Sequence, residues 1–492
     1  MAICVIGGGF AGLTAAIRIK GARPCLDVLL VEKRVPESNT QIAGMRLRAG
    51  IGHQRVDPVA EIAGLLASRN AGVVTQPMKL LAETVVAELN YWHQLPSFVG
   101  CEDRPEWFGP QWGIANRAGR GHGKSVLNWL RAQASARGVR IVWGEVQQLK
   151  LTLTGTSVDA ILVAADRTRS SEAVSFSVRA DVYVLAAGSS GGGLFLSTNK
   201  QIRHSSQELA YTAGLPLIDS TIHMIHPFGN CKSDGTPLIN CYETDRLAGA
   251  NVYTGVSAGR KHLHQLSSGL LVRHEAHNHF PELVREFNRQ GGVVQLEFPD
   301  GSAKVARVSH HYHHLGVETV DGVRVAGLDN LYAAGDASGL GHWTNHKERF
   351  PGFALVKSLV DAALIAQSVC EMISALSRAA VTIEHVRERC GARRRAEQTG
   401  ESGVGLRRVN SGYLADLFGS PDPAARYAVA AAWMKALCDI AHRHGWTSLL
   451  EIALGMAYAH REVSAGRSAE PLRIDRRLVR QLRTEQAGLG CV

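Results

Sequence analysis

The first 34 residues, MAICVIGGGFAGLTAAIRIKGARPCLDVLLVEKR, constrain the fold more than any other stretch of the chain. An apolar run ends in the pattern G-x-G-x-x-G, and apolar residues then recur at helical spacing. A second apolar run ends in an acidic residue twenty positions after the last glycine. This order predicts a β-α-β unit that binds the pyrophosphate of a dinucleotide.

Each part of this unit has its own physical task. Gly7 permits the tight turn, Gly9 lets the backbone approach the pyrophosphate, and Gly12 lets helix and strand pack closely. The helix N-terminus would direct N–H groups at the phosphates. Glu32 would accept hydrogen bonds from a ribose diol, which disfavours NADP, and Lys33 beside it is a further expected cofactor contact. NAD and FAD both satisfy this unit.

Two later segments favour FAD. Residues 181–188 (DVYVLAAG) predict a buried strand that ends in small residues, and residues 329–339 (DNLYAAGDASG) repeat that design with an acid after the glycine. A long, extended dinucleotide needs such a second platform, where a carboxylate can reach the pyrophosphate and ribityl region. The contacts expected at these two strand ends are Ala187, Gly188, Gly335 and Asp336.

The chain resembles the FAD-binding flavoproteins of the succinate dehydrogenase, fumarate reductase and L-aspartate oxidase superfamily. The resemblance covers most of residues 2–370 and rests on the order and spacing of its motifs. These motifs are the N-terminal unit, ESNTQIAG, GKSVLNWL, DVYVLAAGSSGG, IHPF, HHYHHLGV, GLDNLYAAGDASG and RFPGFAL. The resemblance implies an α/β fold: a Rossmann-like FAD-binding domain with an inserted capping (substrate) domain and a C-terminal helical region.

Shifts in composition place the boundaries of these parts. We expect the FAD-binding domain over 1–215 and 313–376, the capping domain over 216–312, and the helical region, rich in Ala, Leu and Arg at helical spacing, over 377–492. Within the first part, alternation on both sides of a glycine-containing turn predicts a β-hairpin in residues 149–167.

The family resemblance also implies how the flavin is held. Some members attach it through the histidine of a Ser-His-Thr sequence, whereas this chain has Ser38, Asn39 and Thr40. Asparagine cannot form that bond, so we expect non-covalent FAD with Ser38 and Thr40 as contacts. Ala354 and Leu355 resemble the Ser-Leu pair that opens the flavin-end helix, whose N–H groups would face the pyrimidine edge of the flavin.

The substrate residues are likewise implied by the resemblance. His311 matches a substrate-facing histidine, His226 a carboxylate-contacting histidine, and Arg349 an arginine that clamps a carboxylate through its planar fork. The family's proton-relaying arginine has no clean match between residues 230 and 275. Two candidates for that role are Arg246 and Arg260.

Four histidines surround a tyrosine in SHHYHHL, residues 309–315. Alternation along a strand would point His311 and His313 to one face, and His310 and His314 to the other. This pattern could chelate a metal, but no nearby carboxylate completes a ligand set and the family needs none, so no metal site is predicted. For His310, His313 and His314 a structural or solvated role is the favoured interpretation, and for His311 it is the alternative to a substrate role.

Composition narrows the class of partner. The chain has 492 residues and a formal net charge of +10, without a long Lys/Arg run, which favours small anionic substrates over nucleic acid. Its nine cysteines lack the paired spacings of zinc and iron–sulfur sites. No apolar run is long enough to span a membrane and no targeting segment is evident, so we expect a cytoplasmic protein.

Together these features predict an FAD-dependent dehydrogenase or oxidase, similar to L-aspartate oxidase, that transfers hydride from a small carboxylic or amino acid to flavin N5. Oxygen or a diffusible electron acceptor would reoxidise the flavin. One alternative is a flavin-dependent reductase of an unsaturated carboxylic acid. Another, suggested by the basic composition, is an FAD-binding RNA-modifying protein.

Overall fold

The computed structural model describes residues 1–33, 46–47, 59–60, 63, 79, 82–84, 86–88, 112–113, 122–165, 175–189, 194–195, 206–221, 223–232, 237–241, 247–254, 261–267, 283–284, 286–287, 292–339, 353–372, 380–386, 401–420, 422–467 and 472–488. The chain divides into two compact units. Unit 1 comprises residues 1–189, 204–217 and 315–394, and unit 2 comprises residues 190–203, 218–314 and 395–492. The predicted division into a capping domain and a separate helical region stays a prediction.

Unit 1 alternates strands and helices along the chain. Its elements are β1 (Ala2–Ile6), α1 (Phe10–Ala22), β2 (Asp27–Glu32), β3 (Arg46–Leu47), β4 (Trp112–Gly113), α5 (His122–Ala136), β5 (Arg140–Leu151), β6 (Val158–Ala165), β7 (Ser175–Arg179), β8 (Val182–Leu185), α7 (Ser206–Ala213), β16 (Gly316–Val317), β17 (Thr319–Val320), β18 (Arg324–Val325), β19 (Leu331–Ala333), the 3-10 turn η1 (Gly335–Ala337), α11 (Phe353–Met372) and β20 (Thr382–Val386). The short strand β9 (Leu217–Ile218) lies where the chain passes from unit 1 to unit 2.

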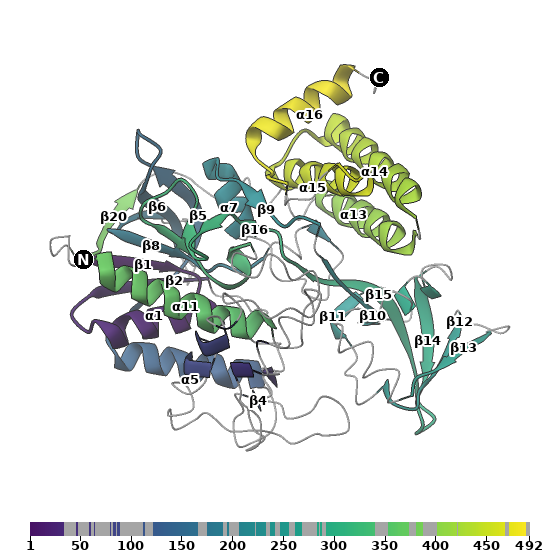
Figure 1. Ribbon diagram of the computed structural model, residues 1–492, viewed down its shortest axis with the longest axis horizontal. Helices are drawn as coiled ribbons and strands as arrows, with labels where there is room; N and C mark the ends of the chain where they lie inside the picture. The colour runs from purple at the N-terminus through teal and green to yellow at the C-terminus, as the bar shows by residue number, and fades with distance from the viewer. Residues whose placement is uncertain are drawn as a thin grey trace. The chain divides into compact units, whose positions relative to one another are not determined.

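A ten-stranded sheet organises unit 1, with the order β17-β18-β19-β8-β1-β2-β5-β6-β7-β20. Its centre is parallel, because β1 pairs in parallel with β2 and β8, β2 with β5, and β8 with β19. Helix α1 lies between α5 and α11 and contacts both of them (Figure 1). This α/β architecture confirms the predicted fold class.

The core of unit 1 lies where β1 and α1 meet. All five residues of β1 are buried, and Leu13 and Ile17 of α1 are fully enclosed. Burying one such side chain stabilises the fold by about 1.5–3 kcal/mol. The hairpin predicted in residues 149–167 is confirmed by the antiparallel pairing of β5 with β6, and Gly155 in its turn has a φ of 72°.

Unit 2 combines an antiparallel sheet with a group of helices. Its elements are β10 (His223–Cys231), β11 (Pro237–Cys241), β12 (Asn251–Thr254), β13 (His262–Gln265), β14 (Val293–Glu297), β15 (Ala303–His313), α13 (Glu401–Gly419), α14 (Pro423–His444), α15 (Ser448–Ser464) and α16 (Arg476–Gly488). The sheet has six strands in the order β11-β10-β15-β14-β12-β13.

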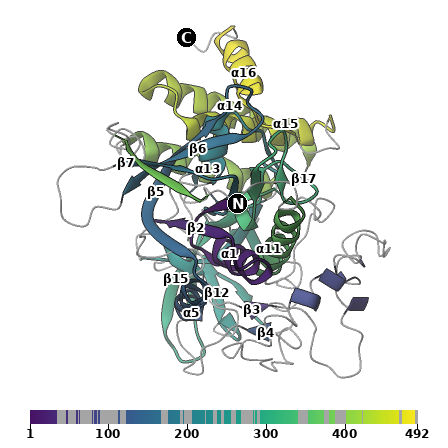
Figure 2. The same ribbon diagram turned by 90° about the vertical axis from the view of Figure 1, so that its left-hand side faces the viewer.

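Local capping explains where the helices of unit 2 begin. The Asp422 carboxylate accepts a 2.8 Å hydrogen bond from the backbone N–H of Ala425 at the start of α14, and Pro423 occupies the first turn. The Thr447 hydroxyl caps α15 in the same way. The four helices α13 to α16 lie together in both views (Figure 1, Figure 2). Within the described ranges, no helix is long and apolar enough to cross a membrane.

Candidate functional site: a dinucleotide cradle at one sheet edge

Three expected cofactor segments follow three neighbouring parallel strands. The glycine turn follows β1, Ala187 and Gly188 follow β8, and Gly335 and Asp336 follow β19. Because β1, β8 and β19 pair side by side in parallel, their carboxyl ends meet at one edge of the sheet. This edge is where open α/β sheets bind dinucleotides.

Glycine is required in the turn after β1. Gly7 has a φ of 108°, and a Cβ atom there would lie 2.4 Å from the carbonyl oxygen of Ala186. A Cβ atom on Gly12 would lie 1.9 Å from the carbonyl oxygen of Gly7. Helix α1 starts after Gly9 without a side-chain cap and without an acid in its first turn. The positive end of its dipole is therefore left for an anion such as a pyrophosphate.

Glu32 lies at the end of β2, beside this turn. A Cβ atom on Gly8 would be 2.3 Å from the Glu32 carboxyl carbon, so the carboxylate is packed against the turn. The Arg131 guanidinium of α5 binds it through two N–H groups, with its Nε 3.1 Å from Oε2. Burial raises the pKa of Glu32, and the hydrogen bond and charge of Arg131 oppose that rise. This position suits a carboxylate that accepts hydrogen bonds from a nucleotide ribose.

Sequence reasoning missed Arg131. Its guanidinium also lies 5.8 Å from the centre of the Trp143 ring, and Trp143 is opposite Glu32 in the register of β5 with β2. Nothing in the sequence of α5 indicates that this arginine reaches the acid. Lys33, expected near the cofactor, places its ammonium 2.5 Å from the Glu145 carboxylate.

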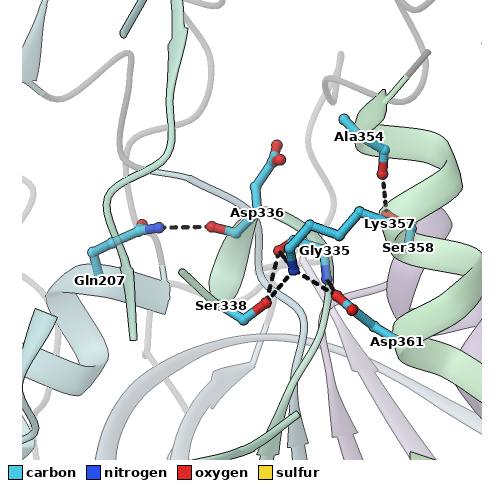
Figure 3. A network of polar contacts seen from close by, with 8 residues as sticks. All are labelled: Gln207, Gly335, Asp336, Ser338, Ala354, Lys357, Ser358 and Asp361. Carbon is cyan, nitrogen blue, oxygen red and sulfur yellow. Dashed lines mark hydrogen bonds and ion pairs between the residues drawn. The ribbon is translucent and has the colours of Figure 1, made fainter. Parts of the chain in front are cut away.

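The turn after β19 forms a second platform, drawn in Figure 3. Gly335 has a φ of 63°, and its N–H donates to the Asp361 carboxylate at 2.8 Å. The Gln207 side chain donates to the carbonyl oxygen of Asp336 at 2.8 Å and to that of Leu315 at 2.7 Å. The Asp336 carboxylate points away from the hydrogen-bonded network (Figure 3). The backbone of this turn is therefore held by the protein while its acid projects outward.

A buried ion pair on α11 anchors the same turn. Lys357 and Asp361, one helical turn apart, lie 2.6 Å from each other, and their side chains are only 4% and 3% exposed. The Lys357 ammonium also donates to the carbonyl oxygen of Gly335 at 3.0 Å and to the hydroxyl of Ser338. Its three N–H groups thus have three protein acceptors. The only sequence signal for this pair is its i, i+4 spacing.

Some of the remaining expected cofactor contacts lie in the described part of the structure and others do not. Ala354 and Leu355 lie in the first turn of α11 and are partly exposed. Gly188 has a φ of 75° with open space around it. Five predicted residues lie outside the described residues: Ser38, Thr40, Arg246, Arg260 and Arg349.

The two substrate histidines can be placed only by their backbone. His226 lies in β10 and His311 in β15, while their side chains are outside the described part of the structure. In the pairing of these strands, Met224 opposes Tyr312 and the next residue, Ile225, opposes His310. His311 is therefore the extra residue of a β-bulge.

The bulge overturns the alternation predicted for this histidine segment. His310 and His313 were expected on opposite faces, but both rings lie against Phe195, with ring centroids 4.1 and 5.9 Å away. A bulge adds one residue to a strand, so the side chains beyond it change face. His310, His313 and His314 are also buried rather than solvated. Among the residues that the structure describes, no group of three or more His, Cys, Asp and Glu side chains could hold a metal ion.

Comparison with known proteins identifies the class. Residues 2–342 match the family model of FAD-dependent oxidoreductases, DAO, and the chain belongs to that family. FAD is thus its cofactor, in agreement with the glycine turn, the adjacent acid and the two further strand ends. No curated protein matches the chain.

Solved structures share the fold. The chain superposes on E. coli quinol fumarate reductase FrdA with a TM-score of 0.66 and 16% identity, covering 95% of this chain and 88% of that one. For the Mycobacterium smegmatis Sdh1 complex the values are 0.62, 18%, 94% and 86%. For adenylylsulfate reductase from Archaeoglobus fulgidus they are 0.53, 12%, 98% and 89%. These structures confirm the fold that the resemblance to fumarate reductase flavoproteins predicted.

Proposed function

We propose that this oxidoreductase is a dehydrogenase or oxidase that removes hydrogen from a small carboxylic or amino acid. The observation that carries the proposal is the bulge at His311. Bulges re-aim a side chain and are over-represented next to active sites, and this one falls on the histidine that the family motif assigns to the substrate. The net charge of +10 also favours an anionic substrate.

Each proposed substrate residue has a distinct task. FAD, when bound, accepts the hydride. Arg349 would grip one carboxylate in two places, while His311 and His226 would hold the other end of the substrate. Arg246 and Arg260 are the candidates for handling the proton that leaves with the hydride. Orientation of the carbon–hydrogen bond toward the flavin is then the main contribution of the protein.

The test is a panel of amino and dicarboxylic acids, L-aspartate and succinate among them, mixed with the purified protein under nitrogen. We expect at least one acid to bleach the flavin absorbance. If oxygen is the acceptor, admission of air should restore the colour and form peroxide. If dithionite bleaches the flavin and no acid does, the proposal is wrong. A reductase would instead show reoxidation of the dithionite-reduced flavin by an unsaturated acid such as fumarate.

Two variants test the assigned residues. His311→Ala and Arg349→Ala should slow flavin reduction by about 100-fold or more while the protein keeps its FAD. His262→Ala is the matched control, because His262 is an exposed histidine on β13 of the same sheet. If both site variants reduce their flavin at the parental rate, the site assignment fails.

A further inference from the structure

Three histidines of unit 2 form a continuous line of hydrogen bonds. His223 on β10 places its Nδ1 3.3 Å from Nε2 of His310 on β15, and its Nε2 3.1 Å from Nε2 of His460 on α15. Their exposed fractions are 2%, 4% and 9% in the order His223, His310, His460. His223 is therefore the most buried ring and lies in the middle of the line, and His460 on α15 is the least buried ring and lies at one end.

Aromatic side chains hold these rings in place. Phe195 stacks on His310 with ring centroids 4.1 Å apart, and the rings of His223 and His460 stack at 5.2 Å. Trp433 lies 6.0 Å from His460, and its indole N–H donates to Asn410 at 2.8 Å. Rings confined in this way keep their nitrogens within hydrogen-bond distance.

The rings of His223 and His460 are neutral near pH 7. Burial, together with the neighbouring His460, His310 and His313, lowers the pKa of His223 well below its usual value. Burial lowers the pKa of His460 to about 4. A neutral imidazole has one N–H donor and one acceptor nitrogen. His223 lies between two rings and also hydrogen-bonds the backbone of Ser220. A His223 ring that donates to one neighbouring ring and accepts from the other gives the line two alternative hydrogen arrangements.

We propose that His310, His223 and His460 form a proton relay between the β10–β15 strand pair and α15. The proton released by the substrate binds Nδ1 of His310, and the Nε2 proton of that ring passes to Nδ1 of His223. The Nε2 proton of His223 then passes to Nε2 of His460, and the Nδ1 proton of His460 passes to water, because His460 is the most exposed of the three rings at 9%. One proton enters, one leaves, and the three rings end in the opposite hydrogen arrangement.

The relay gives the proposed reaction a proton path and rests on that proposal. Oxidation of a carboxylic or amino acid sends one hydrogen to the flavin as hydride and releases another as a proton. His310 directly precedes the bulged His311 in β15, and His223 is three residues before His226 in β10. The relay therefore starts on the two strands that carry the proposed substrate histidines.

The first experiment needs no substrate. Nitrogen NMR of the FAD-loaded protein with ¹⁵N-histidine should show His223 exchanging between its two tautomers. In His460→Gln the amide can still hydrogen-bond His223 but has no second ring nitrogen, so the exchange should stop. A single fixed tautomer of His223 in the parent protein would overturn the relay, whether or not any acid reduces the flavin.

The second experiment follows protons during turnover. An acid that bleaches the flavin is mixed anaerobically with the enzyme and a pH-indicator dye. The parent should release its proton together with bleaching, whereas His310→Gln and His460→Gln should release it about 100-fold more slowly. His313→Leu is the control, since this buried ring lies 5.7 Å from that of His310 but neither of its nitrogens has a hydrogen-bond partner among the described residues. Parental proton release in both Gln variants would overturn the relay and leave the proposed function intact.

Discussion

Lys357 and Asp361 link single residues to the cofactor site. Both charges are buried, and together they bind the N–H and the carbonyl oxygen of Gly335, the residue before the projecting Asp336. Neither side chain needs to touch FAD to affect its binding. They are positioning residues, because they define where the Asp336 backbone lies.

The ion pair predicts a contrast between single and double variants. Lys357→Met leaves the Asp361 carboxylate without its cation in the protein interior, and should lower the free energy of unfolding by about 3–5 kcal/mol. Replacing Lys357 by Met and Asp361 by Leu together removes both charges and should restore most of that loss. Both proteins should release FAD faster than the parent, because Gly335 loses one of its two side-chain hydrogen bonds in the single variant and both in the double variant.

Urea unfolding and the rate of FAD release after dilution measure these two effects separately. If the double variant is as unstable as the single one, the two side chains do not act as a pair. If it holds FAD as tightly as the parent, the turn after β19 does not depend on them.

At the scale of elements, the β1–α1 turn gives the sharpest prediction. Gly12→Ala should yield protein without bound FAD, since a Cβ atom 1.9 Å from the carbonyl oxygen of Gly7 prevents the turn from closing. Gly412→Ala is the matched control: this glycine lies inside α13 with open space around it, and the change should stabilise the protein by about 0.5–1 kcal/mol. Flavin content per chain and thermal unfolding report both outcomes. A Gly12→Ala protein with full FAD would show that the tight turn is not needed.

The same elements show how far sequence reasoning reaches. The β1–α1–β2 unit was predictable because glycine spacing, helical periodicity and the terminal acid are all local in sequence. The face of His313 was predicted wrongly, because a bulge depends on how β10 pairs with β15, and alternation within one strand carries no trace of it. The Arg131 contact with Glu32 joins residues 99 positions apart, and no local pattern encodes such a pairing.

The buried histidines of unit 2 predict that the whole protein becomes less stable as the pH falls. The pKa of His313 and His460 is about 4 in the folded protein and that of His223 is also lowered, against an ordinary value of 6.5. Between these values the unfolded chain binds more protons than the folded one, so stability is retained above pH 6.5 and is lost as the pH falls toward 4. Each histidine contributes a slope of up to about 1.4 kcal/mol per pH unit.

The pH dependence has an internal check. His313→Leu removes one titrating group, and it removes no hydrogen bond to any residue that the structure describes. The free energy of unfolding, measured in urea, should therefore fall less steeply between pH 6.5 and 4.5 than that of the parent, by the slope that one bound proton contributes. An unchanged slope would mean that His313 is not neutral in the folded protein. The variant should be at least as stable as the parent at pH 7, since burying ring nitrogens that have no hydrogen-bond partner in the described part of the chain is costly.

We infer that FAD lies non-covalently at the sheet edge formed by β1, β8 and β19. The most direct measurement is the flavin content of the purified protein after acid precipitation, determined in both precipitate and supernatant. We expect a yellow protein whose FAD passes wholly into the supernatant, because Asn39 offers no covalent attachment. A colourless protein that takes up no added FAD, or a precipitate that stays yellow, would contradict it.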